Sequence, residues 1–231
     1  MSTFDMEALM PVPKATYKDY VIRYIYNGIM ERRFQPGQKI LEQELSLELG
    51  ISRAPVREAL RQLVGEGLLT YQPQKGHTVT ILDAKQVLAC YETRGVIEGY
   101  AAALSAPLLA REEMKELERL TGAMTRYARR GEHRELIERG EEFHSLILNR
   151  CPNGELLNAA NRLSRMLHIL FYTHWGTLYS PEEVASRHRL ILEALRKGDS
   201  QEIEQVVRQH YFETGRKIAQ QPDISRTKES A

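Results

Sequence analysis

The segment 41–66 constrains the fold most, because it contains two short helices joined by a tight turn. Apolar residues repeat at helical spacing over 41–49, and Gly50 ends that helix. Ser52 is a suitable N-cap for a second helix over 53–66. The inner stripe of this second helix consists of Val56, Leu60 and Leu63. Two short helices joined by a turn that contains glycine indicate a helix-turn-helix.

The elements on either side of this motif complete a small winged domain. Apolar residues at helical spacing predict a preceding helix over 17–34, which Pro36 and Gly37 end. After the motif, β-branched and aromatic residues nearly alternate over 68–71 and 77–82, with a turn between them. We therefore expect a winged helix-turn-helix made of three helices and a β-hairpin.

No strand pattern follows residue 84. Helical patterns broken by Gly and Pro cover 84–108, 111–130, 133–149, 155–176, 181–197 and 199–220. The fold class is therefore mainly α, with the winged domain followed by an all-α bundle of six to seven helices. We expect the winged domain to cover 1–82, the helical domain 83–222 and a flexible tail 223–231.

Composition narrows the class of protein. The 231 residues carry a formal net charge of +1, so any affinity for nucleic acid depends on local placement of charge. Two cysteines are too few for a disulfide framework or a thiolate metal cluster, which fits a reducing cytoplasm. No window approaches about 18 consecutive apolar residues, and the N-terminus lacks a leader pattern. We expect a soluble, cytoplasmic protein with no membrane partner.

The start of the second helix is the candidate DNA-reading element, because that part of a helix-turn-helix enters the major groove. Arg53 and Arg57 are four residues apart and share one helical face. An alternative is that both are ordinary surface residues paired with carboxylates, Arg57 with Glu58 for example. The candidate DNA-binding residues are Ser52, Arg53, Pro55 and Arg57 at the helix start and Lys75, Gly76, His77 and Thr78 in the wing.

Four polar residues of the helical region lie on otherwise apolar faces. They are Arg94, His144, His188 and His210. Buried imidazoles and a buried guanidinium are costly without partners, and a shared cavity that holds a metal, an anion or both would satisfy all of them. The alternatives are separate core histidines with local hydrogen bonds, and an Arg94–Glu98 ion pair within one helix.

At this point the N-terminal region resembles a known family. The runs PGQKI, LEQELSLELGISRAPVREALRQLVGEGLL and QKGHTV, within 34–79, are similar to the DNA-binding domain of the GntR family of repressors. The resemblance implies that Arg53 and Arg57 read bases or clamp phosphates and that the wing tip around Gly76 enters the minor groove. Some members carry a DNA-contacting Arg early in the first helix of the motif, where this chain has Gln43.

The helical region 85–215 resembles the FCD ligand-binding domain of the FadR subfamily, through YETRGVIEGYAA, EEFHSLI and SRHRLILEALRKGDSQEIEQVVRQH. The resemblance implies a divalent metal held by one Asp and three His, completed by a small carboxylate effector. His144, His188 and His210 match the histidines, but the Asp position is Gly140. Three imidazoles can still hold Zn²⁺ or Ni²⁺. Glu141 is a possible substitute ligand, and a metal-free cavity is the alternative.

We therefore expect a homodimeric transcription regulator, a repressor, whose operator affinity is controlled by a small organic acid anchored by Arg94. Two other classes stay open. A metal-dependent hydrolase with a three-His site would need a general base and an open cleft. An architectural DNA-binding protein without a ligand would have a fully apolar bundle interior.

Overall fold

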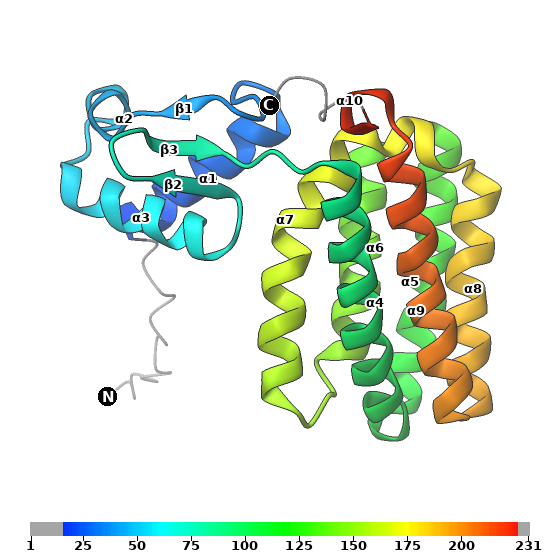
Figure 1. Cartoon of the computed structure of the whole chain (residues 1–231). Coiled ribbons are helices and arrows are strands. Elements are labelled where there is room, and N and C mark those ends of the chain that lie inside the picture. Colours follow the sequence, from blue (N-terminus) through cyan, green and yellow to red (C-terminus); the bar gives the residue numbers. More distant parts are fainter. Residues whose placement is uncertain (1–15, 226–231) are drawn as a thin grey trace, which may run out of the picture. The chain divides into compact units, whose positions relative to one another are not determined.

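The computed structural model describes residues 16–225, which form two compact units (Figure 1). The first unit contains 16–65 and 69–79, and the second contains 66–68 and the chain from Thr80 onward. The fold class predicted from the sequence is confirmed, since a small sheet and three helices are followed by a helical bundle. Within the described residues, no helix is both long and apolar enough to cross a membrane.

The first unit is a winged helix-turn-helix with one strand more than predicted. Its elements are α1 (Tyr17–Met30), β1 (Lys39–Ile40), α2 (Glu42–Leu49), α3 (Arg53–Gly65), β2 (Leu69–Gln72) and β3 (Gly76–Val79). The sheet has the order β1-β3-β2 and is antiparallel throughout. The expected hairpin, β2 and β3, is therefore part of a three-stranded sheet in which β3 is central, because two-residue β1 pairs with its other edge.

Helix α1 ends at Met30 and not at Phe34 as the apolar spacing predicted. The chain leaves the helix through Arg32, whose φ of 60° is left-handed. The Phe34 backbone N–H then donates to the Gly28 carbonyl at 3.0 Å, and a Cβ on Gly28 would lie 2.4 Å from the Phe34 ring. The turn therefore folds Phe34 back onto α1 through a contact that only glycine permits.

The turn of the motif has the predicted form. Gly50 ends α2 with φ 64°, a left-handed conformation that favours glycine. The Ser46 hydroxyl donates to the Ile51 carbonyl at 2.6 Å, which ties the turn to α2. Buried apolar side chains of α1, α2 and α3 then fix the angle between the helices; they are Val21, Ile25, Leu45, Val56, Leu60 and Leu63.

The second unit is a bundle of long helices. They are α4 (Ala84–Ser105), α5 (Arg111–Arg130), α6 (His133–Leu148), α7 (Gly154–Leu178), α8 (Pro181–Lys197) and α9 (Ser200–Ala219), with the short η1 (Ala106–Leu108) and α10 (Pro222–Ser225). Capping boxes begin α4 at Asp83 and α8 at Ser180. Residues 223–225, expected to belong to a flexible tail, lie in α10, where Asp223 accepts a hydrogen bond from His174 at 2.9 Å. Residues 226–231 lie outside the described chain.

Helices α4 and α9 lie side by side along most of their length (Figure 1). Glycines permit this close approach: a Cβ on Gly99 would lie 2.7 Å from the Glu204 carbonyl oxygen, and one on Gly215 would lie 2.5 Å from Tyr91. This contact matters for the site, because α4 carries Arg94 and α9 carries His210.

Candidate functional site

Helix α3 presents an exposed basic surface. Arg53, Arg57 and Arg61 are all exposed and follow at intervals of four residues, so they lie along one side of the helix. Ser52 is exposed just before the helix, and Pro55 lies in the first turn, where a missing N–H costs nothing. Arg61 is an additional candidate that the same spacing would have identified.

Arg57 forms a two-pronged ion pair. Its Nε donates to Glu42 Oε2 at 3.0 Å, and its Nη2 donates to Glu42 Oε1 at 2.7 Å. The expected alternative of a carboxylate partner is therefore realised, but the partner is Glu42 at the start of α2 and not Glu58. The hydrogen bonds from Arg57 hold the pKa of Glu42 below its ordinary value, so the carboxylate is ionised at neutral pH.

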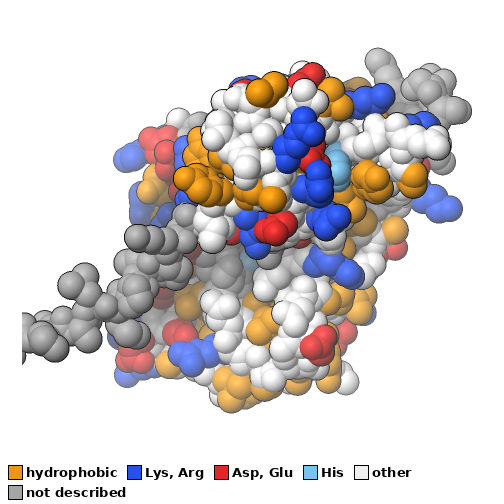
Figure 2. All heavy atoms as spheres, turned by 90° about the vertical axis from the view of Figure 1, so that its left-hand side faces the viewer, with side chains coloured by type: hydrophobic (Ala, Val, Ile, Leu, Met, Phe, Trp, Pro, Cys, Tyr) orange, Lys and Arg blue, Asp and Glu red, His pale blue; other side chains and the backbone are white. Residues whose placement is uncertain are grey.

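The wing lies close to this pair. Burial lowers the pKa of His77, the charge of Glu42 raises it and that of Arg61 lowers it, so all three belong to one neighbourhood. The His77 ring lies 4.9 Å from the Tyr71 ring. Lys75 is exposed in the turn, Thr78 is half-buried, and Gly76 has φ 84°. Figure 2 shows Lys and Arg side chains gathered beside a histidine on this face. The α3 and wing candidates therefore form one surface.

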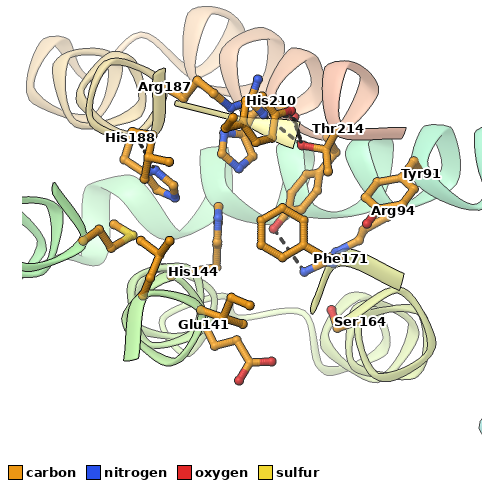
Figure 3. A pocket seen from close by; sticks show the side chains of 17 residues that line it. Tyr91, Arg94, Glu141, His144, Ser164, Phe171, Arg187, His188, His210 and Thr214 are labelled. Carbon is orange, nitrogen blue, oxygen red and sulfur yellow. Dashed lines mark hydrogen bonds between the residues drawn. The ribbon is translucent and has the colours of Figure 1, made fainter. Parts of the chain in front are cut away.

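The helical bundle contains a cavity of about 100 Å³ (Figure 3). Side chains from all six long helices line it. The residues that line it include Tyr91, Arg94, Met124, Gly140, Glu141, His144, Ser164, Phe171, Tyr179, Arg187, His188, His210, Tyr211 and Thr214. The four polar residues expected to share a cavity are all in this lining.

The three histidines converge. Their ring centroids lie 5.0–5.5 Å apart, and one ring nitrogen of each lies within 4.8 Å of the others. Figure 3 shows His144 directed toward the space between His188 and His210. Burial lowers the pKa of His188 to about 4 and the pKa of His144 and His210 well below the ordinary value, with nearby cations adding to the effect on all three. The imidazoles are therefore neutral at neutral pH.

A neutral imidazole has one nitrogen with a lone pair that can bind a metal. Hydrogen bonding identifies this nitrogen in His188 and leaves one nitrogen of His210 without a partner. His188 Nδ1 lies 2.9 Å from the Val184 carbonyl oxygen, so Nδ1 carries the proton and Nε2 carries the lone pair. His210 Nδ1 is buried and has no hydrogen-bond partner among the described residues. An orphaned buried nitrogen beside two further imidazoles fits a divalent metal of the Zn²⁺ or Ni²⁺ kind.

Arg94 is both paired and directed to the cavity. Its Nε donates to Glu98 at 2.6 Å, its Nη2 donates to the Tyr211 hydroxyl at 3.3 Å, and the guanidinium lies 4.3 Å from the Tyr211 ring centroid. Glu98 is 1% exposed and also accepts from Ser164 and from the Tyr211 hydroxyl. Burial opposes the charge on Arg94, but Glu98 and Tyr211 raise its pKa above the ordinary value. The ion pair considered as an alternative therefore exists and holds Arg94 against the cavity wall.

A second arginine of the cavity, Arg187, was not singled out by the sequence pattern. Its side chain is 11% exposed; Nη1 donates to Glu213 at 2.5 Å, and Nη2 donates to the His210 carbonyl and the Thr214 hydroxyl. Tyr179 stacks on its guanidinium at 4.2 Å. The sequence signal was weak, because Arg187 follows Val184 by three residues and so lies only at the edge of the inner face of α8.

Neither Gly140 nor its neighbour Glu141 supplies a carboxylate ligand beside the three histidines. Gly140 lines the cavity, and a Cβ there would meet only Met124 Sδ, at an ordinary 3.7 Å. Glu141 is exposed at the cavity edge, lies outside the group of nitrogens within 4.8 Å, and turns its carboxylate away from the rings in Figure 3. This arrangement does not bring the substitute ligand to the cluster.

Comparisons with known proteins agree with both units. Residues 18–79 match the family model described as bacterial regulatory proteins, gntR family, and residues 89–213 match the FCD domain. The chain is 30% identical over 190 residues to the HTH-type transcriptional regulator YdhC of Bacillus subtilis (strain 168), covering 82% of this chain and 83% of that one. It is 29% identical over 201 residues to a D-xylose utilization operon transcriptional repressor of Paenarthrobacter nicotinovorans, with 85% and 86% covered.

A solved structure shares the fold. Escherichia coli McbR/YncC is similar with a TM-score of 0.70 and 22% identity, covering 85% of this chain and 93% of that one. These families and relatives are transcription regulators and not enzymes. The chain therefore belongs to the GntR family of bacterial transcription regulators, with an N-terminal DNA-binding domain and a C-terminal FCD effector-binding domain.

Proposed function

We propose that this regulator is a repressor that binds operator DNA as a homodimer, through Arg53, Arg57 and the wing residues 75–78. The exposed arginines on one side of α3 support base reading, and exposed Lys75 with the half-buried residues 76–78 supports contacts to phosphates or the minor groove. Two-fold pairing supports binding to a pseudo-palindromic operator, because it doubles the contacts of one small domain. Because DNA is the partner, we propose the bacterial cytoplasm as its place of action.

The convergence of three histidines and Arg94 on one cavity is the observation that carries the sensing role. The ligand that fits is a small carboxylate. Arg94 uses Nε and one Nη2 hydrogen for Glu98 and Tyr211, which leaves Nη1 to meet a carboxylate. A cavity of about 100 Å³ suits a small organic acid. Bound acid would bias the placement of the DNA-binding units and so control operator affinity.

We further propose that His144, His188 and His210 hold a divalent metal in this cavity. Bound there, the ion would supply a positive charge and an open coordination position for an acidic effector. Gly140 leaves that shell one carboxylate short of the pattern that the FCD resemblance implies. The neutral imidazoles, their mutual distances and the orphaned His210 Nδ1 support this site.

The two other functional classes fit less well. A hydrolase needs a general base beside the three imidazoles, whereas Glu141 turns its carboxylate away from them (Figure 3). An architectural protein without a ligand needs an apolar interior, whereas this cavity is lined by histidines and arginines. Both alternatives also conflict with the family to which the chain belongs.

The DNA-binding role is tested by replacing Arg53 or Arg57 with alanine. An operator is first selected from a pool of random duplexes. Each variant should then discriminate between operator and unrelated DNA about 5- to 150-fold less than the wild type. Arg111→Ala, at the start of α5, serves as a charge-matched control. Equal losses on operator and unrelated duplex would reduce these arginines to phosphate contacts.

The sensing role is tested with Arg94→Lys, which keeps the buried charge opposite Glu98 but loses the planar fork. We expect normal operator binding and loss of release by a panel of acetate, lactate, malonate and citrate. Arg208→Lys is the control, because this half-buried arginine of α9 is outside the cavity lining. A variant that still responds to the same acid as the wild type would refute the anchor role.

The metal site is tested with Gly140→Asp, which the free space beside Met124 permits. If the histidines hold a metal, an added carboxylate ligand four residues before His144 should tighten Ni²⁺ or Zn²⁺ binding in a calorimetric titration by at least the roughly 10- to 100-fold that partners behind a metal ligand contribute. His188→Ala should abolish the binding. Absence of metal from purified protein, together with no heat on titration of either protein, would remove the metal from the proposal.

A further inference from the structure

The geometry of the Arg57–Glu42 pair leaves one side of the guanidinium open. A guanidinium has two edges that can donate a pair of parallel hydrogen bonds, Nε with one Nη, and the two Nη atoms together. Glu42 takes the first edge through its two carboxylate oxygens. No other hydrogen bond of Arg57 occurs within residues 16–225, so the second edge is available for another acceptor.

That free edge has the chemistry that reads guanine. Guanine presents O6 and N7 in the major groove, and an arginine that donates to both makes the commonest specific contact. A free arginine side chain has several rotatable bonds and loses much conformational freedom when it binds. Arg57 is half exposed, with 51% of its side chain accessible, while Glu42 retains only 23%. The carboxylate is therefore a partly buried support that restrains an exposed arginine before DNA arrives.

The charge of Glu42 points the same way. Its carboxylate is close enough to Arg53, Arg57 and His77 for all three to lower its pKa, so an anion lies within the surface that should meet phosphates. Such an anion weakens the attraction to any duplex, because it offsets cationic charge that would otherwise release counterions. Hydrogen bonds to bases do not depend on counterion release. The anion therefore mainly weakens binding that has no sequence preference.

We propose that Glu42 is a specificity-determining positioning residue: it holds the Arg57 guanidinium with its outer edge toward a guanine of the operator and reduces attraction to unrelated DNA. This inference rests on the proposed role of Arg57 in base reading. It assigns a part in recognition to the first residue of α2, whose side chain contacts Arg57.

The test compares full-length Glu42→Gln with Glu44→Gln, which removes the same charge from an exposed neighbour in α2. Affinities for the selected operator and for a scrambled duplex are measured at several salt concentrations. We expect Glu42→Gln to bind the scrambled duplex more tightly and to lose about 10-fold or more in the ratio of the two affinities. Glu44→Gln should keep the wild-type ratio.

Two further variants separate position from charge. Glu42→Asp keeps the anion but shortens the side chain, so it should lose discrimination without gaining affinity for the scrambled duplex. In an Arg57→Ala background, Glu42→Gln should lower the ratio less than it does in the wild type, because only the charge effect remains once Arg57 is gone. Thermal melts check that each variant is folded.

The results distinguish a failure of the Glu42 role from a failure of the Arg57 role. Wild-type ratios in Glu42→Gln and Glu42→Asp, with Arg57→Ala still defective, would overturn the role of Glu42 and leave that of Arg57 intact. If Arg57→Ala also keeps the wild-type ratio, base reading by Arg57 is lost and the role of Glu42 is lost with it. A wild-type protein that prefers no duplex would overturn operator binding itself.

Discussion

Each unit of this regulator contains an arginine held by a glutamate, but the two pairs differ in their access to water. In the DNA-binding unit, the Arg57 side chain is 51% exposed and Glu42 is 23% exposed. In the effector-binding unit, Arg94 is 15% exposed and Glu98 is 1% exposed. In both pairs the glutamate takes Nε of the guanidinium and leaves other N–H groups for a ligand.

The difference shows how one motif serves two purposes. Water screens the exposed pair, so it adds little to stability and acts mainly by orienting the arginine. The buried pair has lost its hydration, so each charge depends on the other and on the Tyr211 and Ser164 hydroxyls. We therefore expect changes at Glu42 to alter recognition far more than stability, and changes at Glu98 to alter stability first.

The largest effect should come from Glu98→Ala. The substitution leaves the Arg94 charge in the bundle without its partner, and removing one member of a buried pair typically costs about 3–5 kcal/mol. The free energy of unfolding from urea titration measures it. Glu92→Ala, on an exposed face of the same helix, is the control. A loss under about 1 kcal/mol for Glu98→Ala would mean that water reaches the pair and that the comparison fails.

A smaller effect should follow from Gly99→Ala, which disturbs the contact between α4 and α9 that surrounds the buried pair. The added Cβ would lie 2.7 Å from the Glu204 carbonyl oxygen, so the helices must separate. Overpacking of this kind costs about 1–3 kcal/mol. Gly122→Ala, where the nearest atom is the flexible Arg126 Nη1 at 3.5 Å, should be neutral or stabilising. Equal results for both variants would show that α4 and α9 tolerate a wider separation.

The smallest expected effect is the pH dependence of the stability that the exposed Arg57–Glu42 pair contributes. Because the folded-state pKa of Glu42 lies below its ordinary value of 4.5, its stabilising contribution is present above that value and disappears as pH falls through the lowered folded-state pKa. The difference in melting temperature between wild type and Glu42→Gln should be small at pH 7, constant down to about pH 5 and lost in stronger acid. A melting-temperature difference that grows as the pH falls would contradict the lowered pKa of Glu42.

Much of the fold could be read from local patterns. Helical spacing predicted the three helices of the winged unit and the six long helices of the bundle, because amphipathic faces repeat along the chain. Strand β1 escaped prediction, since two residues carry no alternation and it exists only through pairing with β3. The end of α1 also escaped, because the Phe34–Gly28 contact that fixes it lies beyond any local spacing.

The candidate site was predictable in part for the same reason. Each histidine could be assigned to an inner face from its own helix, and so could Arg94. Their approach to one another could not, because it depends on how α6, α8 and α9 pack. The second cavity arginine, Arg187, lies at the edge of an inner face, where periodicity gives an ambiguous answer.

The amino-acid sequence by itself determined the order of the elements, the inward faces of the bundle helices and the arginines at the start of α3, since these follow from residue spacing along one segment. Only the tertiary structure decided which charges meet: Glu42 with Arg57 across the turn, and three histidines from three helices around one cavity. Such contacts depend on packing between segments distant in the chain, and the energy of a charge depends on the water that this packing leaves around it.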